Sequence, residues 1–154
     1  MYVFDTSIFI ILFTYYYPRR FPTLWNSFND LVHDGRIIST RENLREINET
    51  LSGFQEWVDE NTTVFQDINA AEGAFVTQIY SVRHFQQNIE QQKLLKGGLN
   101  ADPFIIAKAA IREASVVTSE LHKSNSAKIP NICEHCGIPC LNLEQFMESE
   151  GWSF

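Results

Sequence analysis

The stretch Tyr2-Val3-Phe4-Asp5-Thr6-Ser7 decides the fold, because three apolar residues are followed at once by a carboxylate and two hydroxyls. A short apolar run of this kind is typical of a buried strand, and Thr6 or Ser7 is suited to cap a helix over Ile8–Tyr15. Far along the chain, Ala101-Asp102-Pro103-Phe104-Ile105-Ile106-Ala107 places another aspartate at the start of a helix-like segment. Folding is expected to bring both aspartates into one acidic pocket.

Outward from these two stretches, strands and helices alternate. Strands are predicted over residues 2–4, 36–39, 115–118 and 140–143, and helices over 8–15, 21–32, 41–51, 103–113 and from 144 onward. Residues 54–95 are helical and polar, and we expect them to form a helical cap. Strands separated by helices favour a parallel α/β sheet, and parallel strands gather their carboxyl ends along one edge.

The length and composition indicate one soluble domain over residues 1–154. The chain is 44% hydrophobic, which is enough to bury one core. Its apolar run Ile8–Phe13 is far shorter than the roughly 20 residues of a membrane helix, and no basic segment precedes it as in a signal peptide. Three cysteines, an odd number, argue against a disulfide framework. We therefore expect a cytoplasmic protein without a membrane partner.

The net charge restricts how the chain can bind nucleic acid. Twelve Lys and Arg against 19 Asp and Glu give a charge of −7, whereas bulk binding of phosphates normally needs a basic excess. A metal-dependent nuclease is still compatible with this charge, because bound cations neutralise its acidic cluster. The local basic groups are interpreted as solvated surface: Arg19-Arg20, Arg83-His84, Lys93 with Lys96, and Lys108 with Arg112.

Four acids fall at the predicted carboxyl edge of the sheet. Asp5 follows the first strand, Glu46 lies in the helix after the second strand, Asp102 opens a later helix, and Glu120 follows the strand 115–118. Hard divalent cations such as magnesium prefer carboxylate and water oxygens. The arrangement therefore predicts a metal site that cleaves phosphodiesters.

Each acid also has an ordinary structural interpretation. Asp102 before a proline is suited to be an N-cap, and Glu120 suits a surface loop. Glu42, Glu46 and Glu49 share one helix flank, so periodicity cannot choose among them. The coincidence of four acids at the same edge, and not any one of them, supports the site.

Four segments together resemble the PIN-domain ribonucleases, including the VapC-like toxins of bacterial and archaeal toxin–antitoxin pairs. They are Val3-Phe4-Asp5-Thr6-Ser7, Leu44-Arg45-Glu46-Ile47, the stretch from Asn100 to Ala109, and Val116-Val117-Thr118-Ser119-Glu120. The ending from Lys128 to Cys133, followed by Gly137-Ile138-Pro139-Cys140, looks like a little-characterised PIN branch. The resemblance covers nearly the whole chain and selects Glu46 among the three glutamates.

The resemblance implies a three-layer α/β/α domain with a central, mostly parallel sheet. It also implies an endoribonuclease whose Mg²⁺ or Mn²⁺ is held by Asp5, Glu46, Asp102 and Glu120, and which leaves 5′-phosphate and 3′-hydroxyl ends. Many relatives carry aspartate at the position of Glu120, whose longer arm suits contact through a water. The hydroxyls that orient the carboxylates are expected to be those of Thr6, Ser7, Thr118 and Ser119. As the toxin of a type II pair, the chain would have RNA and a cognate antitoxin as partners.

Two other groups of residues have alternative interpretations. Cys133, Cys136 and Cys140 with His135 offer the ligand types of a structural zinc site, but there is only one C-x-x-C pair, which favours reduced cysteines without a metal. The aromatic residues Tyr15, Tyr16, Tyr17 and Trp25 suit either a partner or homodimer surface or the core.

Two further functions compete with the ribonuclease. One is an interaction module that keeps a PIN-like fold and cleaves poorly, which is favoured if Glu120 cannot serve the site. The other is a phosphatase or phosphotransferase with Asp5 as nucleophile. The haloacid-dehalogenase pattern for that chemistry has a second aspartate two residues on, where this chain has Ser7.

Overall fold

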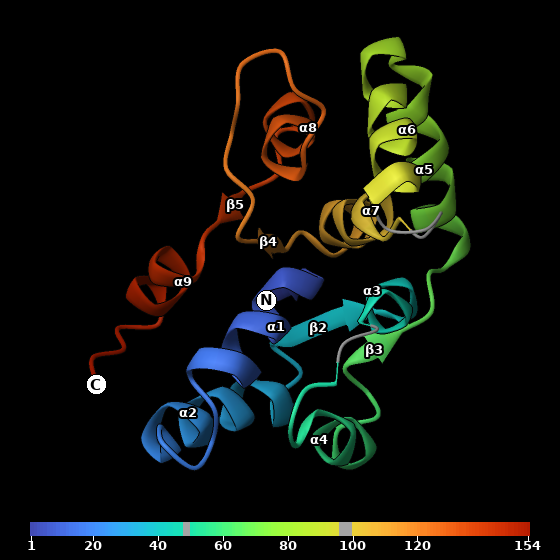
Figure 1. Ribbon diagram of the computed structural model, residues 1–154. Helices are drawn as coiled ribbons and strands as arrows, with labels where there is room; N and C mark the ends of the chain where they lie inside the picture. Colours follow the sequence, from blue (N-terminus) through green and yellow to red (C-terminus); the bar gives the residue numbers. More distant parts are fainter. Residues whose placement is uncertain (48–49, 96–99) are drawn as a thin grey trace.

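The centre of the molecule is a five-stranded parallel sheet with the strand order β3-β2-β1-β4-β5 (Figure 1). A computed structural model describes residues 1–47, 50–95 and 100–154. The first strand lies in the middle, so the strand order reverses between β1 and β4, which is where open α/β sheets bind ligands. The prediction of a parallel sheet is confirmed. The strands are β1 (Tyr2–Phe4), β2 (Ile37–Thr40), β3 (Phe65–Gln66), β4 (Ser115–Val117) and β5 (Cys140–Leu141).

Helices cover both faces of this sheet, which gives the three-layer α/β/α architecture expected from the sequence (Figure 1). One face packs against α1 (Thr6–Tyr15), α2 (Pro22–His33), α4 (Phe54–Glu60) and α9 (Leu143–Ser149). The other face packs against α5 (Ala70–Ser81), the short 3₁₀ helix η1 (Arg83–Phe85), α7 (Asp102–Arg112) and α8 (Ile129–Cys136). The remaining helices are α3 (Arg41–Glu46) and α6 (Gln86–Leu95). No helix in the described ranges has the length and apolar character needed to span a membrane.

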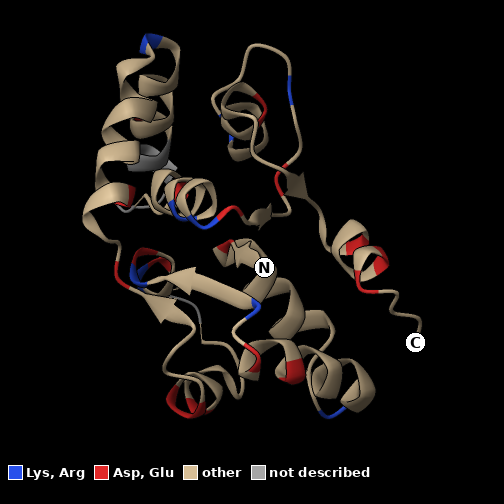
Figure 2. Cartoon of the chain, turned by 180° about the vertical axis from the view of Figure 1, so that it is seen from behind, with Lys and Arg blue, Asp and Glu red and all other residues tan. Residues whose placement is uncertain are grey.

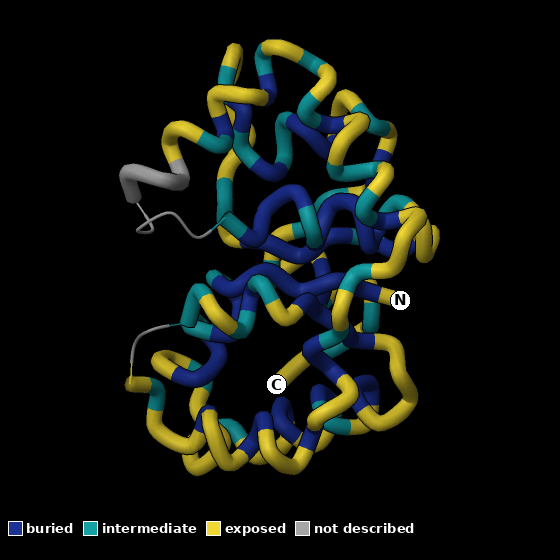
Figure 3. The backbone as a smooth tube through the Cα atoms, turned by 90° about the vertical axis from the view of Figure 1, so that its right-hand side faces the viewer, coloured by how far each residue is buried: buried dark blue, intermediate teal, exposed yellow. Residues whose placement is uncertain are grey.

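Alternation along the strands divides the core in two. In β1, Tyr2 and Phe4 join the cluster under α1 and α2, whereas Val3 joins the cluster under α7 and α8. In β4, Val117 and Val116 divide in the same way. Successive strand side chains point to opposite faces, so a strand covered on both sides must be apolar throughout. Buried residues accordingly concentrate around the sheet in the middle of the molecule (Figure 3).

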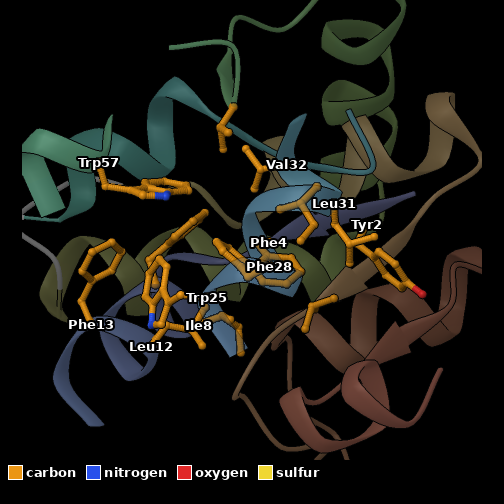
Figure 4. Close-up of a cluster of buried hydrophobic side chains, with 14 of the residues drawn as sticks. Tyr2, Phe4, Ile8, Leu12, Phe13, Trp25, Phe28, Leu31, Val32 and Trp57 are labelled. Atoms are coloured by element: carbon orange, nitrogen blue, oxygen red, sulfur yellow. The ribbon is translucent and has the colours of Figure 1, made fainter. Parts of the chain in front are cut away.

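Aromatic rings fill the core on the α1–α2 side (Figure 4). The Phe4 ring lies 5.8 Å from that of Phe28, and the Phe13 ring packs edge-on against Trp25 at 4.7 Å. Trp25 is 3% exposed and so belongs to the core, not to a partner surface. Tyr15 and Tyr17 are exposed. The surface alternative therefore fits these two tyrosines, and the core alternative fits Trp25.

Several predicted boundaries are wrong. The helix after β2 ends at Glu46 and not at Leu51, because Ile47 has extended backbone angles. The segment 54–95 is not helical throughout: it contains β3, a two-residue strand that pairs with Ser39 and Thr40. Helix α8 was not predicted, although it has proline in its first turn and ends at Gly137 in the left-handed conformation, which are both common at helix ends.

The basic pair on α7 does not form a solvated surface. Lys108 is fully buried, and its Nζ lies 3.0 and 3.2 Å from the two carboxylate oxygens of Glu72 on α5. Arg112 is more exposed and approaches the same carboxylate at 3.6 Å. The interpretation of Lys108 as a surface cation is therefore wrong, because a buried acid on the neighbouring helix pairs with it. The other basic residues are spread over separate elements of the chain (Figure 2).

Candidate active site

Asp5 lies at the carboxyl end of the central strand β1 and is 3% exposed. Its Oδ2 accepts hydrogen bonds from Ser7 Oγ at 2.6 Å and from Thr118 Oγ1 at 2.9 Å. Thr118 directly follows β4, so this contact spans the point where the strand order reverses. Neutral hydroxyl donors orient the carboxylate without cancelling its charge.

The hydroxyls at the start of α1 are used differently from the predicted helix cap. The helix begins at Thr6 with Asp5 as its N-cap residue, so neither Thr6 nor Ser7 caps it. Thr6 Oγ1 instead donates to Glu46 Oε2 at 2.9 Å, and the Ser7 hydroxyl donates to Asp5. Ser119 contributes its backbone N–H, which donates to Ser7 Oγ at 3.1 Å, and not the hydroxyl that the sequence suggested.

Glu46, the last residue of α3, connects the two parts of the chain that carry aspartates. Its Oε2 accepts from Thr6, the neighbour of Asp5, and its Oε1 accepts from the Ala101 N–H at 2.7 Å. Ala101 immediately precedes Asp102. The Glu46 carboxylate therefore holds together the turn after β1 and the start of α7.

Asp102 is fully buried in the first turn of α7. It is not the predicted N-cap: Ala101 has that position, and the Asp102 side chain turns to Asn88 on α6, whose Nδ2 donates to Oδ2 at 2.9 Å. Burial and the charge of Asp102 raise the pKa of Tyr80 above its ordinary value.

Glu120 is half-buried in the loop after β4, and one of its oxygens has a structural contact. Its Oε2 accepts from the N–H of Ile129, the first residue of α8, at 2.9 Å. Its own N–H donates to Thr118 Oγ1 at 3.1 Å, so the Thr118 hydroxyl joins Glu120 to Asp5. Glu120 therefore has a structural role, because its carboxylate stabilises the N-terminus of α8.

The Cys140 thiol lies within the electrostatic influence of both Glu120 and Asp5. A hydrogen bond with Cys133 lowers the pKa of Cys140, against the opposing effects of burial and of the two carboxylates. Asp5 follows β1 and Glu120 lies in the loop after β4, so both acids follow the carboxyl ends of neighbouring parallel strands. The His135 ring packs edge-on against Phe85 at 5.0 Å, so it faces η1.

The four acids have the ligand chemistry that a divalent cation needs, but in the described ranges no three of them are grouped around one point. Carboxylate oxygens are the ligands that Mg²⁺ and Mn²⁺ prefer, and Asp5, Glu46, Asp102 and Glu120 all supply them. Within the described ranges, however, no three His, Cys, Asp or Glu side chains are grouped so as to hold a metal ion. Within the same ranges, the three cysteines and His135 likewise form no group that could hold a metal ion. An ion at the acidic edge would have to draw the carboxylates closer together.

Two amides that sequence reasoning missed hold the acids. Asn43 Nδ2 donates to Thr6 Oγ1 at 2.9 Å and lies 3.5 Å from Asp5 Oδ1, while Asn88 holds Asp102. Both asparagines are buried. The available signal for Asn43 was its position three residues after the cap Thr40 and three before Glu46, on a short polar helix.

The neighbours of Glu46 on the predicted helix flank make different contacts. Glu42 Oε1 lies 3.7 Å from Arg45 Nη1. Glu49 lies outside the described residues. Within the described part of this flank, Glu46 makes the contacts to the aspartate-bearing turns.

The chain matches the model of a described family over almost its whole length. A family model described as a domain of unknown function, DUF4411, matches residues 2–154. The chain belongs to this family. None of the curated proteins matches it. The matched range includes β1 through α9, so all four acids lie within the domain that defines the family.

Proposed function

We propose that the chain is a Mg²⁺- or Mn²⁺-dependent endoribonuclease whose site is formed by Asp5, Glu46, Asp102 and Glu120. The observation that carries the proposal is the position of Glu46, which accepts hydrogen bonds from the neighbours of both aspartates. Its contacts connect the turn after β1, which carries Asp5, to the start of α7, which carries Asp102, and β1 adjoins the reversal of strand order. Ligand sites of open α/β sheets lie at this place.

The side chains around the acids have defined tasks in this proposal. Ser7 and Thr118 orient Asp5, Thr6 orients Glu46, and Asn88 orients Asp102. Such partners fix the direction of a ligand's lone pairs and so contribute to metal affinity. A divalent ion bound there would supply an acidified water and neutralise charge on the scissile phosphate.

Glu120 has a supporting role. One of its oxygens receives the Ile129 N–H, and its backbone N–H shares the Thr118 hydroxyl with Asp5. Contact with a cation through a bridging water is compatible with this arrangement, because a hydrogen bond from the neutral Ile129 N–H leaves the carboxylate its anionic charge.

The biological part of the proposal rests on the sequence resemblance. PIN-domain toxins act on RNA in the cytoplasm and are restrained by a cognate antitoxin, and the same role is proposed for this chain. Its charge of −7 means that RNA binding depends on local Lys and Arg contacts and on bridging cations. Binding is therefore expected to be weak without divalent ions and to decrease with added salt.

A second candidate function is favoured by a specific observation. In the described ranges no three acidic, His or Cys side chains form a ready metal group, and the Glu120 carboxylate is directed to α8. Both findings suit an interaction module that retains the architecture and cleaves poorly. Such a module would bind its partner without any change in RNA.

The experiment that separates the two candidates measures cleavage of a labelled single-stranded RNA in Mn²⁺, Mg²⁺ or EDTA. The wild-type chain is compared with Asp5→Asn and Asp102→Asn, each of which removes a charge without changing size, and with Asp30→Asn on the exposed face of α2. Cleavage that needs the metal and is lost only in the first two variants supports the nuclease. Full activity in either site variant contradicts this assignment of the site, and absence of cleavage by the wild-type chain favours the interaction module.

A further inference from the structure

A cavity of about 320 Å³ opens beside the acidic edge, between α3 and the start of α7. Its volume is within the range of small-ligand sites. The residues that line it combine rings, an acid and a cation: Glu42, Arg45, Tyr80, Asn100, Pro103 and Phe104. None of these side chains is used in the metal site proposed above, so the cavity needs an explanation of its own.

Glu42 is the unusual member of this lining. Its side chain is 22% exposed, and its Oε2 is buried and accepts no hydrogen bond from the residues that the structure describes. Its Oε1 lies 3.7 Å from Arg45 Nη1, which is longer than a hydrogen bond. A buried carboxylate oxygen without a donor destabilises the protein, and native structures rarely keep one without a reason. A ligand that brings hydrogen-bond donors is such a reason.

We propose that this cavity binds a guanine base of a single-stranded RNA, with Glu42 as the residue that recognises it; the inference rests on the proposed ribonuclease function. Guanine presents two adjacent donors, N1–H and the 2-amino group, which match the two oxygens of one carboxylate. Adenine and cytosine present an acceptor beside their amino group, and uracil has a single N–H between two acceptors. A carboxylate therefore favours guanine over the other three bases.

Glu42 reaches the base by turning its carboxylate outward. Rotation about the terminal bond alone would exchange the two equivalent oxygens and leave one of them buried, so the preceding side-chain torsion has to change as well. Both oxygens then face the donors of guanine, including the one that accepts no hydrogen bond from the residues that the structure describes.

The other lining residues fit the same ligand. Unstacked bases of single-stranded RNA pack on aromatic and apolar side chains, which Tyr80, Phe104 and Pro103 supply here. Arg45 is 63% exposed at its side chain and is placed to meet a phosphate. The Tyr80 ring is fixed, because its hydroxyl donates to Asn88 Oδ1 at 3.3 Å and accepts from Asn100 Nδ2 at 3.1 Å.

The cavity is close enough to the acids to select the cleavage position. Glu42 and Glu46 are four residues apart on α3, so their Cβ atoms are separated by roughly 5–6 Å. Asn100 and Pro103 of the lining flank Ala101 and Asp102. A base held at Glu42 therefore keeps a neighbouring phosphate near Glu46 and Asp102.

The test measures binding apart from cleavage. The wild-type chain is titrated in EDTA with guanosine, inosine and adenosine 5′-monophosphates, and binding is followed by NMR chemical-shift changes. Inosine lacks only the 2-amino group, so it isolates one of the two proposed contacts. We expect guanosine monophosphate to bind roughly tenfold more tightly than the other two, as for a good carboxylate–base contact. In Glu42→Gln the three affinities should become similar, whereas the exposed α4 variant Glu56→Gln should keep the preference.

Equal affinities in the wild-type chain, or a guanine preference that survives Glu42→Gln, overturn the inference. Mapping of cleavage positions in a mixed-sequence RNA separates this failure from failure of the proposed function. Metal-dependent cleavage without a guanine preference contradicts the base pocket and leaves the nuclease intact. Selective binding of guanosine monophosphate without any RNA cleavage contradicts the nuclease and supports the pocket.

Discussion

The Glu46 Oε1 atom accepts a hydrogen bond from the Ala101 N–H at 2.7 Å, across 55 positions of the chain. This contact ties the end of α3 to the start of α7, where Asp102 is buried. The second oxygen of Glu46 receives the hydroxyl of Thr6 beside Asp5. A change at Glu46 therefore acts on the surroundings of both aspartates at once.

Glu46→Gln is expected to reduce metal-dependent cleavage of every RNA by at least roughly a hundredfold, because loss of a proposed metal ligand costs no less than loss of a residue that orients one. The amide keeps the size of the side chain and loses the charge. Glu42→Gln should instead alter which sequences are cleaved. Initial rates on a guanine-containing and a guanine-free RNA distinguish the two effects. Equal and sequence-independent losses in both variants would leave the choice of Glu46 without support.

Thr118→Val tests the hydroxyl that joins Asp5 to the loop after β4. The substitution removes the 2.9 Å hydrogen bond to Asp5 Oδ2 and the acceptor for the Glu120 N–H. We expect roughly a 10- to 100-fold loss of cleavage, because the partners that orient a metal ligand contribute about that much. The matched control is Thr62→Val at an exposed position. Activity like that of the control would show that Asp5 needs no such orientation.

The buried ion pair between Lys108 and Glu72 predicts a large effect on stability. Lys108→Met leaves a buried carboxylate without its close cation: the Asn69 N–H still donates to Glu72 Oε2 at 3.0 Å, but Arg112 approaches Oε1 only at 3.6 Å. The free energy of unfolding should fall by about 3 kcal/mol, and the additional change Glu72→Gln should restore part of it. Urea denaturation measures both, with Lys123→Met as the exposed control. A change in Lys108→Met no larger than in the control would contradict the burial of this pair.

Tyr2 predicts a pH dependence at alkaline pH. Burial and the hydrogen bond from its hydroxyl to Glu150 raise the pKa of Tyr2 from 10.0 to about 12. Because the folded state holds the phenol proton more tightly, this contribution to stability is complete below pH 10 and is lost as the pH rises toward 12. Because the pKa of Tyr80 is raised as well, ultraviolet difference titration should show two late phenolate steps, of which Tyr2→Phe loses one and the exposed variant Tyr15→Phe loses neither. A Tyr2→Phe titration with both late steps unchanged would contradict the assignment to Tyr2.

Features with a local cause were predictable from the sequence. The apolar run Tyr2–Phe4 broken by Asp5 predicted the central strand and its acid, because burial on both faces requires continuous apolar residues. Gly35 ends α2 with a positive φ of 68°, as its position after the apolar stripe indicated. The alternation of strands and helices was sufficient for the parallel sheet.

Features that depend on distant partners were not predictable. Strand β3 has two residues and exists because Ser39 and Thr40 pair with it. Lys108 carries no local signal of burial, since its partner Glu72 lies on another helix. Asn88 meets Asp102 only when α6 packs beside α7, and its polar neighbours in sequence gave no indication of that role. In each case tertiary contact overrides the local pattern.

The central claim, a metal-dependent hydrolysis of RNA at the Asp5, Glu46 and Asp102 edge, is tested most directly by analysis of the RNA ends after digestion started with Mn²⁺. We expect fragments with 5′-phosphate and 3′-hydroxyl ends that form only with the metal, because water attacks the phosphorus and the 3′ oxygen leaves. Fragments with 2′,3′-cyclic phosphate ends, or fragments that form equally in EDTA, would contradict it.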